Sequence, residues 1–381
     1  MPMQPFDDVQ YRPEQPALAP RPEVALTSPA YHGALDYAEL EQLGLSPESI
    51  VDFSVNSNPY GPSPTVRQAL LDVPVERYPD REALALRRAL ADQLGVSPAH
   101  IVLGNGAAEL LWLAAFACLG SGERALIIGP TFGEYARLAA LMGAQVETWQ
   151  AQPAANFAVS FEAVAGRLQA WQPRLVFLCN PNNPTGVVLP LDTISGWAQA
   201  QPQTLFIVDE AYLAFAPQAC SALSLRADNV LVTRSMTKDY ALAGLRLGYA
   251  VSTNRMMIDA LARVRPAWNV NAMAQAAGLA ALADEAYRQQ TLAALGQHTK
   301  TLVAGLGRLD LSAVPSATHY FLLEVGQAAA FRRALLRQGL LVRDCASFGL
   351  PSYVRIATRR PPENERLLSA IASLGALAIE E

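Results

Sequence analysis

Residues 204–212, TLFIVDEAY, contain a short apolar run that is followed by two acidic residues, Asp209 and Glu210. Apolar runs of similar length stand at 101–104, 124–129, 144–149, 174–179 and 229–235. Stretches with helical periodicity, such as 107–120 and 132–143, lie between them. Apolar strands that alternate with helices are typical of a mainly parallel β-sheet covered by helices on both faces. The sequence therefore predicts an α/β fold, in which a large domain contains such a sheet.

The pattern changes after about residue 272, where helical stretches dominate. One pair of strand-like runs follows, HYFLLEV at 319–325 and SYVRIAT at 352–358. Helices combined with a few strands predict a smaller α+β domain. We expect residues 272–381 to form most of this domain.

The expected division of the chain assigns 76–271 to the large domain and 31–75 to the N-terminal part of the small one. Residues 1–30 carry seven prolines and little periodicity. Such a composition predicts an extended arm. The arm is either a free tail or a segment that lies against a partner subunit.

Composition and charge exclude several classes of protein. Of 381 residues, 51% are hydrophobic and 17% are charged, as in a soluble globular enzyme. The net charge of −5 argues against nucleic acid or a membrane surface as the main partner. Four scattered cysteines fit reduced thiols better than disulfides or a metal site. Without a signal peptide or a membrane-spanning run, we expect a cytoplasmic protein.

The stretch LGNGAAE, 103–109, ends an apolar run and opens a helical one. Backbone N–H groups at a helix start beside glycine bind anions such as phosphate. The stretch matches half of a dinucleotide fingerprint, but Glu109 stands where the third glycine would be. We interpret it as a phosphate cradle, with a plain glycine-containing helix start as the alternative.

Two further motifs follow buried runs. CNPNNPTG, 179–186, predicts a rigid turn whose amide side chains face the end of the sheet. Asp209 ends the run quoted above, and a carboxylate at that depth requires a cation or several hydrogen-bond donors. A surface turn and a solvated strand end are the simpler alternatives. In such sheets ligands bind beyond the carboxyl ends of the strands, so we expect these residues to lie together.

The stretch SMTKDYALAGLRLGY, 235–249, adds one amine, two hydroxyls and one guanidinium, from Lys238, Ser235, Thr237 and Arg246. Pyridoxal phosphate requires this combination. Its ring nitrogen needs a carboxylate, its phenolic oxygen and phosphate need donors, and its aldehyde needs an amine. The sequence therefore predicts pyridoxal 5'-phosphate as the cofactor.

With these motifs in this order, the sequence resembles the fold-type I pyridoxal-phosphate-dependent aminotransferase superfamily, class I/II, over roughly residues 31–375. It is similar in particular to the branch that holds histidinol-phosphate aminotransferases and threonine-phosphate decarboxylases. The resemblance implies that fold, an amino-acid substrate and a homodimer with shared active sites.

The resemblance also assigns roles around the cofactor ring. Lys238 would be the Schiff-base lysine, and Asp209 the partner of the pyridine nitrogen. Asn183 and Tyr212 would bond the phenolic oxygen, and Phe132 would stack on the ring. Lys238, Asp209 and Tyr212 are thus the implied catalytic residues.

The phosphate contacts come from two chains in the resemblance. Tyr78 would reach the cofactor phosphate of the neighbouring subunit. Within one chain the phosphate would be held by Ser235, Thr237, Arg246 and the N–H groups of Ala107 and Ala108.

Substrate contacts follow from motifs that point to both members of the branch. NSNPYGPSP, 56–64, resembles the aminotransferases, whereas YHG at 31–33, DFSVN at 52–56, VRDCASFGLP at 342–351 and RPPENERLL at 360–368 are similar to the decarboxylases. Arg355 would bind the substrate carboxylate as a bidentate fork. The other implied substrate residues are His32, Gly33, Asn58, Tyr60, Asn183 and Arg343. An ordinary histidine at a domain edge is the alternative for His32.

Two other classes of protein were weighed. A nicotinamide oxidoreductase has no use for Lys238 and lacks a complete fingerprint here. A cofactor-binding regulator could lose Lys238 or Asp209, but this chain keeps both. We therefore expect an aminotransferase, similar to the histidinol-phosphate enzymes, that acts on an amino acid with an anionic, phosphorylated far end. The alternative is a threonine-phosphate decarboxylase of cobalamin biosynthesis.

Overall fold

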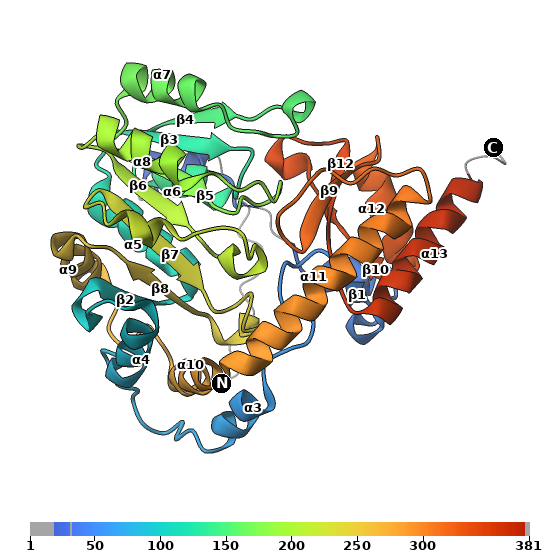
Figure 1. Ribbon diagram of the computed structural model, residues 1–381, viewed down its shortest axis with the longest axis horizontal. Helices are drawn as coiled ribbons and strands as arrows, with labels where there is room; N and C mark the ends of the chain where they lie inside the picture. The colour runs from blue at the N-terminus through green and yellow to red at the C-terminus, as the bar shows by residue number, and fades with distance from the viewer. Residues whose placement is uncertain (1–18, 31–32, 378–381) are drawn as a thin grey trace, which may run out of the picture.

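A seven-stranded sheet forms the centre of the computed structural model, which describes residues 19–30 and 33–377 (Figure 1). The strand order is β2-β8-β7-β6-β5-β3-β4. The bounds are β2 Ile101–Asn105, β3 Arg124–Gly129, β4 Gln145–Gln150, β5 Leu175–Cys179, β6 Leu205–Asp209, β7 Val230–Ser235 and β8 Leu247–Val251. β8 runs antiparallel to both of its neighbours, and the remaining pairs are parallel. The prediction of a mainly parallel sheet is confirmed, although β8 was not anticipated.

Helices cover both faces of this sheet, as its apolar strands require. One face packs against α5 Gly106–Cys118, α6 Glu134–Leu141 and α9 Arg255–Val264. The opposite face packs against α7 Phe161–Trp171, α8 Leu191–Ala200, α4 Leu84–Leu94 and α10 Ala272–Ala283. Successive strand residues alternate between the two cores: Ile207 belongs to the first, Phe206 and Val208 to the second.

A smaller α+β unit lies beside the large one (Figure 1). Its antiparallel sheet has the order β11-β12-β9, with bounds Arg343–Asp344, Tyr353–Ala357 and Tyr320–Glu324. A two-stranded parallel sheet joins β1 Val51–Asp52 to β10 Leu340–Leu341. α12 Ala328–Arg337 and α13 Pro361–Leu377 contribute to its core, together with Phe53. The predicted smaller α+β part is therefore present.

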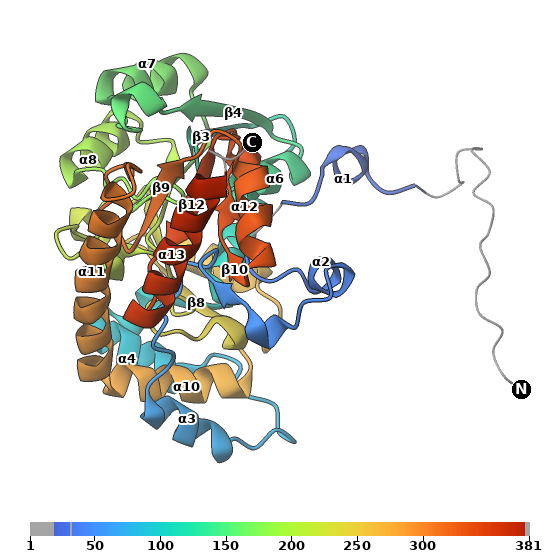
Figure 2. The same ribbon diagram turned by 90° about the vertical axis from the view of Figure 1, so that its right-hand side faces the viewer.

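Helix α11, Glu285–Gly307, extends from the large unit to the small one (Figures 1 and 2). Its Leu295 packs in the core beneath the large sheet, while Leu302 and Leu306 pack in the core of the small unit. α3, Pro64–Leu71, and α10 pack against each other and belong to the large unit's core. We therefore propose a domain division near residue 284, instead of 272, and include α3 in the large domain.

The remaining elements are short. α1 Pro22–Leu26 contacts α6, and α2 Tyr37–Gln42 leads into the small unit. Residues 1–18, most of the expected arm, lie outside the described residues. No helix in the described part of the chain has the length and apolar character needed to cross a membrane. The 3₁₀ segments are Pro47–Ser49, Pro98–His100, Pro153–Ala155, Leu213–Phe215, Ala222–Leu225, Ala243–Leu245 and Ala346–Phe348.

Candidate active site

The carboxyl ends of three adjacent parallel strands bring the predicted cofactor residues together. Asn183 follows β5, Asp209 ends β6, and Lys238 lies three residues beyond β7. Apart from Arg234 on β7 the strand residues are buried, and their last residues stand at the edge where loops begin. This is the edge at which open α/β sheets bind ligands.

The Lys238 side chain is partly accessible, but its amine lies deep among protein groups. Burial is the main reason why the pKa of Lys238 falls from 10.5 to about 8, with further lowering by Arg355 and Arg246. Asp209 acts in the opposite direction. The amine lies 6.0 Å from the centre of the Tyr212 ring. It is thus an amine whose neutral form is accessible near neutral pH.

Asp209 is 6% exposed, and its carboxylate is held by two donors. The Tyr135 hydroxyl donates to Oδ2 at 2.7 Å, and the Ala211 N–H donates to Oδ1 at 3.1 Å. Burial raises the pKa of Asp209, while the hydrogen bond from Tyr135 opposes this shift. Phe132 packs edge-on against Tyr135, with ring centres 5.5 Å apart. The carboxylate therefore has a fixed direction and an aromatic neighbourhood.

An anion cradle lies where β2 enters α5. Gly106 has φ +80°, and a Cβ there would stand 2.7 Å from an Arg246 guanidinium nitrogen. A Cβ at Gly248 would collide with the backbone nitrogen of Ala107. The first turn of a helix has N–H groups without partners inside the helix, and they attract anions. The absence of side chains at both glycines thus lets Arg246 and the α5 N-terminus approach one ligand.

Two hydroxyl groups complete this region. Ser235 ends β7, and its Oγ lies 2.6 Å from Oγ1 of Thr237. Both residues are buried, at 8% and 3% exposure. Hydroxyls so placed are hydrogen-bond donors beside the N–H groups of the cradle.

Two arginines face each other on the small unit's sheet. Arg343 on β11 pairs directly with Arg355 on β12, so both side chains point to the same face. They are 3% and 5% exposed. Arg343 donates to Ser347 Oγ at 2.7 Å, and Arg355 donates to Asn183 Oδ1 and to the Ser54 carbonyl. Guanidinium groups bind carboxylates and phosphates through paired N–H donors, so two of them on one face favour anions.

Aromatic and amide groups connect these arginines to the large unit. Tyr212 packs edge-on against Tyr320, with ring centres 5.0 Å apart, and Arg355 lies over the Tyr320 ring. The Tyr320 hydroxyl donates to the Asn182 carbonyl at 3.0 Å. The Asn56 side-chain amide is fully buried, and its nitrogen and oxygen have no hydrogen-bond partner among the described residues. Its proximity lowers the pKa of Tyr212, which burial raises overall.

Other predicted residues have different surroundings. Gly33 lies against Ser54, and a Cβ at Gly33 would stand 2.6 Å from the Ser54 carbonyl oxygen. The Tyr60 hydroxyl lies 2.7 Å from Nε2 of His298 on α11. Asn58 binds the turn that carries Lys238, as described below. His32 falls outside the described residues.

Tyr78 lies on the surface of the single chain. It is 80% exposed and stacks on Trp268, with ring centres 4.6 Å apart. Both residues neighbour α10, on a surface lined also by Val73, Pro74 and Ala272. Tyr78 is thus available to a second chain.

Sequence reasoning missed several residues of this site, namely Asn56, Tyr135, Tyr320 and His319. His319 is 2% exposed, its ring lies 4.0 Å from that of Phe215, and burial with nearby Arg355 lowers its pKa to about 3. Tyr135 lies in the helical stretch 132–143, but no rule of spacing linked that phenol to Asp209. Asn56 had a signal, since it ends the quoted motif DFSVN, whereas His319 and Tyr320 were read only as part of a strand.

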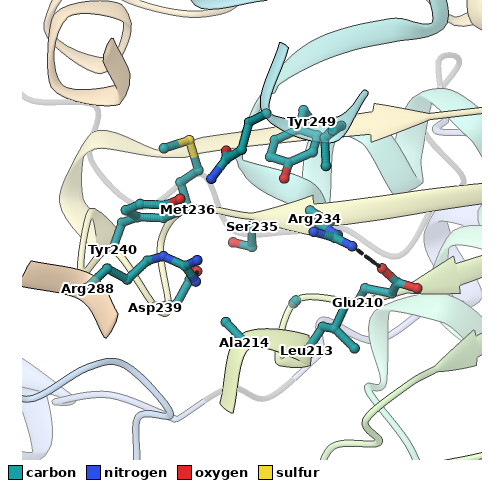
Figure 3. Close-up of a pocket in the computed structure, with 13 residues that line it drawn as sticks. Glu210, Leu213, Ala214, Arg234, Ser235, Met236, Asp239, Tyr240, Tyr249 and Arg288 are labelled. Atoms are coloured by element: carbon teal, nitrogen blue, oxygen red, sulfur yellow. Dashed lines mark hydrogen bonds and ion pairs between the residues drawn. The ribbon is translucent and has the colours of Figure 1, made fainter. Parts of the chain in front are cut away.

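A second group of charged residues lines a pocket close to the Lys238 turn (Figure 3). Arg234 Nε donates to Glu210 Oε2 at 3.0 Å, and Glu210 also accepts from Ser221 and the Ala222 N–H. A cavity of about 270 Å³ separates this pair from Asp239 and Arg288. The described residues contain no group of three His, Cys, Asp or Glu that could hold a metal ion.

Comparison with known proteins gives the same answer as the motifs. A family model described as aminotransferase class I and II matches residues 48–371. Histidinol-phosphate aminotransferase 1 of Thiobacillus denitrificans is 36% identical over 372 aligned residues, with 95% of this chain and 94% of that protein covered. Threonine-phosphate decarboxylase of Salmonella typhimurium is 37% identical over 346 residues, covering 87% and 93%. The crystal structure of histidinol-phosphate aminotransferase from Sinorhizobium meliloti in complex with pyridoxal-5'-phosphate matches with a TM-score of 0.83 and 27% identity, covering 92% of this chain and 96% of that one. The predicted family is confirmed: the chain belongs to the aminotransferase class I and II family.

Proposed function

We propose that this protein is a pyridoxal-phosphate-dependent aminotransferase for an amino acid with an anionic far end. The observation that carries the proposal is the position of the Lys238 amine, which lies deep among protein groups beyond the end of β7 and whose pKa burial, Arg355 and Arg246 lower to about 8. A lysine in such surroundings serves as a nucleophile and as a carrier of protons. The relatives named above support the reaction class.

The residues present fit the cofactor. Gly106, the α5 N-terminus and Arg246 suit its phosphate, because glycine leaves the space that a Cβ would fill. Ser235 and Thr237 add hydroxyl donors. Asp209 suits a protonated ring nitrogen, since it is buried yet keeps donors that favour its charged form. When bound, pyridoxal phosphate supplies an electron sink for the bonds at the substrate's α-carbon.

Around the ring, four residues have further roles. Asn183 and Tyr212 suit the phenolic oxygen, because both polar groups lie at the same strand ends as Asp209. Phe132 suits the face of the ring. Lys238 takes a proton from the α-carbon and returns it elsewhere on the reacting skeleton, which requires a pKa near the working pH.

The two facing arginines support an amino-acid substrate with a second negative group. Arg355 suits the α-carboxylate, because its guanidinium is a bidentate donor close to Lys238 and Tyr212. Arg343 suits the far end, together with Ser347, to which it donates a hydrogen bond. A dianionic far end, such as a phosphate, matches a buried guanidinium better than an uncharged group does.

Decarboxylation is the second candidate, favoured by the decarboxylase relative. The angle at which Arg355 holds the carboxylate determines whether the α-carbon loses a proton or carbon dioxide. Small shifts in such positioning change rates by orders of magnitude. We place transamination first because the histidinol-phosphate relatives cover 95% and 93% of the chain, against 87% for the decarboxylase.

A product assay tests this choice. The protein is loaded with pyridoxal phosphate and given histidinol phosphate with 2-oxoglutarate, or threonine phosphate alone. We expect glutamate from the first mixture. Carbon dioxide and aminopropanol phosphate from the second, without glutamate from the first, would favour the decarboxylase instead.

The chain provides a matched pair of control variants, because its only lysines are Lys238 and Lys300. Lys238→Ala should lose turnover by several orders of magnitude. Lys300→Ala, at an exposed site on α11, should keep it. Products that persist in Lys238→Ala would remove this lysine from the mechanism, whichever substrate is turned over.

The assembly proposed with this function is a homodimer with shared sites. Phe116 on α5 is 63% exposed, although α5 carries apolar residues on nearly every side. A helix of that kind is normally covered. Tyr78 and Trp268 add exposed aromatic surface. A second copy would cover these residues and place Tyr78 near its partner's cofactor phosphate. The four free cysteines support the proposed cytoplasmic location.

A further inference from the structure

The turn that carries Lys238 is bound on two sides by groups far away in sequence. The Asn58 N–H donates to the Lys238 carbonyl at 2.9 Å. The Asn58 side-chain amide donates to the Asp239 carbonyl at 3.1 Å and to Thr291 Oγ1, on helix α11, at 2.8 Å. One buried asparagine thus joins the lysine turn to α11.

An ion pair makes a second connection to the same helix. Arg288, in the first turn of α11, donates to Asp239 Oδ2 at 3.0 Å (Figure 3). Arg288 also binds Glu285 and lies over the Tyr240 ring, 4.9 Å from its centre. Asp239 directly follows Lys238 in the chain. The arginine is therefore held on three sides and directed at the residue next to the lysine.

The pair lies where its loss would be costly. Asp239 is 8% exposed, and burial raises its pKa while Arg288 lowers it. A buried charge that loses its partner is strongly unfavourable, so the turn would rearrange to reach solvent. The adjacent cavity of about 270 Å³ provides room for such movement.

Helix α11 connects this pair to both cores. Leu295 packs beneath the large sheet, and Leu302 packs in the small domain. The small domain also carries Arg355 on β12. A single rigid helix is therefore in contact with the lysine turn at one end and with the substrate-binding domain at the other.

We propose that Arg288 is a positioning residue, which with Asp239 and Asn58 clamps the Lys238 turn to α11 and so fixes the amine relative to the cofactor site. This inference rests on the proposed function, in which Lys238 is the reacting amine. The charged groups that face that amine are Arg355 on β12, Arg246 after 3₁₀ segment Ala243–Leu245, and Asp209 at the end of β6. Neither Arg288 nor Asp239 is among them.

The test measures the amine itself in the cofactor-free protein. Trace labelling with acetic anhydride, read by mass spectrometry of peptides, gives the relative reactivity of Lys238 and Lys300 against pH. Lys300 is the internal reference, because these are the only two lysines. The inflection for Lys238 should lie near pH 8 in the parent protein.

Two single variants separate position from charge. By charge alone, Arg288→Gln would raise the pKa of Lys238 and Asp239→Asn would lower it. If the pair is a clamp, both release the turn, and both should raise the inflection by about half a unit or more. That shift leaves roughly threefold less neutral amine at pH 7. The double variant should shift the Lys238 inflection by the same amount as each single variant, because the same contact is lost in all three. Arg288→Lys should give a Lys238 inflection between those of these variants and that of the parent protein.

Arg332→Gln is the matched control, since it removes a similar ion pair, with Glu39, between α2 and α12. It should lower thermal stability without moving the Lys238 inflection. The clamp is overturned if Arg288→Gln and Asp239→Asn lower the melting temperature yet leave the inflection in place, or shift it in opposite directions. Because the labelling needs neither cofactor nor substrate, this result is independent of the product assay. In the loaded enzyme, kcat should fall in the clamp variants with KM largely unchanged.

Discussion

The protonation state of one amine connects the local environment of Lys238 to the proposed chemistry. A lysine with its ordinary pKa of 10.5 is almost wholly charged at pH 7, whereas a pKa of about 8 leaves roughly one molecule in ten neutral. The gain in neutral amine is about 300-fold. Burial is the largest cause of this shift, and the nearby Arg355 and Arg246, which suit anionic ligands, lower the pKa further.

This environment predicts a pH dependence for cofactor attachment. The cofactor-free protein should take up pyridoxal phosphate at a rate that rises with pH and levels off above about 8, since only the neutral amine attacks the aldehyde. The uptake is measured by borohydride trapping and peptide mapping. The modified peptide should contain Lys238, and Lys300→Ala should give the same profile. A rate that keeps rising beyond pH 9 would contradict the lowered pKa.

At the scale of elements, the cradle depends on close contact between β8, β2 and α5. Gly248 on β8 pairs with Gly104 on β2, and its Cα faces the backbone nitrogen of Ala107. The antiparallel pairing of β8 with β2 thus brings the start of α5 next to Arg246, which directly precedes β8. A methyl group at Gly248 would push the helix start away from the sheet.

Gly248→Ala should therefore destabilise the fold by about 1–3 kcal/mol. It should also weaken pyridoxal phosphate binding roughly tenfold, because the phosphate loses the aligned N–H groups. The control is Gly166→Ala in the interior of α7, where a Cβ would meet open space. There we expect stabilisation of about 0.5–1 kcal/mol and unchanged affinity. Chemical unfolding and fluorescence titration measure both quantities; equal behaviour of the two variants would exclude the packing role of Gly248.

The same elements indicate how far sequence reasoning could reach. Asp209 and Asn183 were predictable partners, because the ends of buried parallel strands meet at one edge of a sheet. Arg288 and Asp239 are 49 residues apart, and their contact depends on where α11 starts. The domain division proposed here differs from the expected one because α10 is apolar on most sides, so its sequence pattern does not tell which core it joins. β8 was not anticipated because it follows an irregular turn, with Ala241 and Arg246 at positive φ. The sequence after that turn has no pattern that distinguishes an antiparallel strand.

At the scale of the whole molecule, one chain holds an incomplete site under the proposed function. Arg246, Ser235 and the α5 N-terminus suit the phosphate from within the chain. Tyr78 faces outward with Trp268, on a surface that neighbours α10. Together with exposed Phe116, these rings form apolar surface that a second copy would bury. The substrate arginines, in contrast, belong to the small domain of the same chain.

A mixing experiment tests whether sites are shared between subunits. Lys238→Ala and Tyr78→Ala subunits, each inactive as homodimers, are combined and allowed to exchange. In a mixed dimer one site keeps its own Lys238 and receives Tyr78 from the other subunit, so about a quarter of all sites should recover at a one-to-one ratio. Mixing Lys238→Ala with Asp209→Asn is the control, because both residues belong to the same chain's site and no mixed dimer contains an intact one. Recovery in the first mixture alone, with exchange demonstrated by mass spectrometry, is the expected result. If neither mixture recovers although mixed dimers form, Tyr78 acts within its own chain, and the outward-facing aromatic pair has another role.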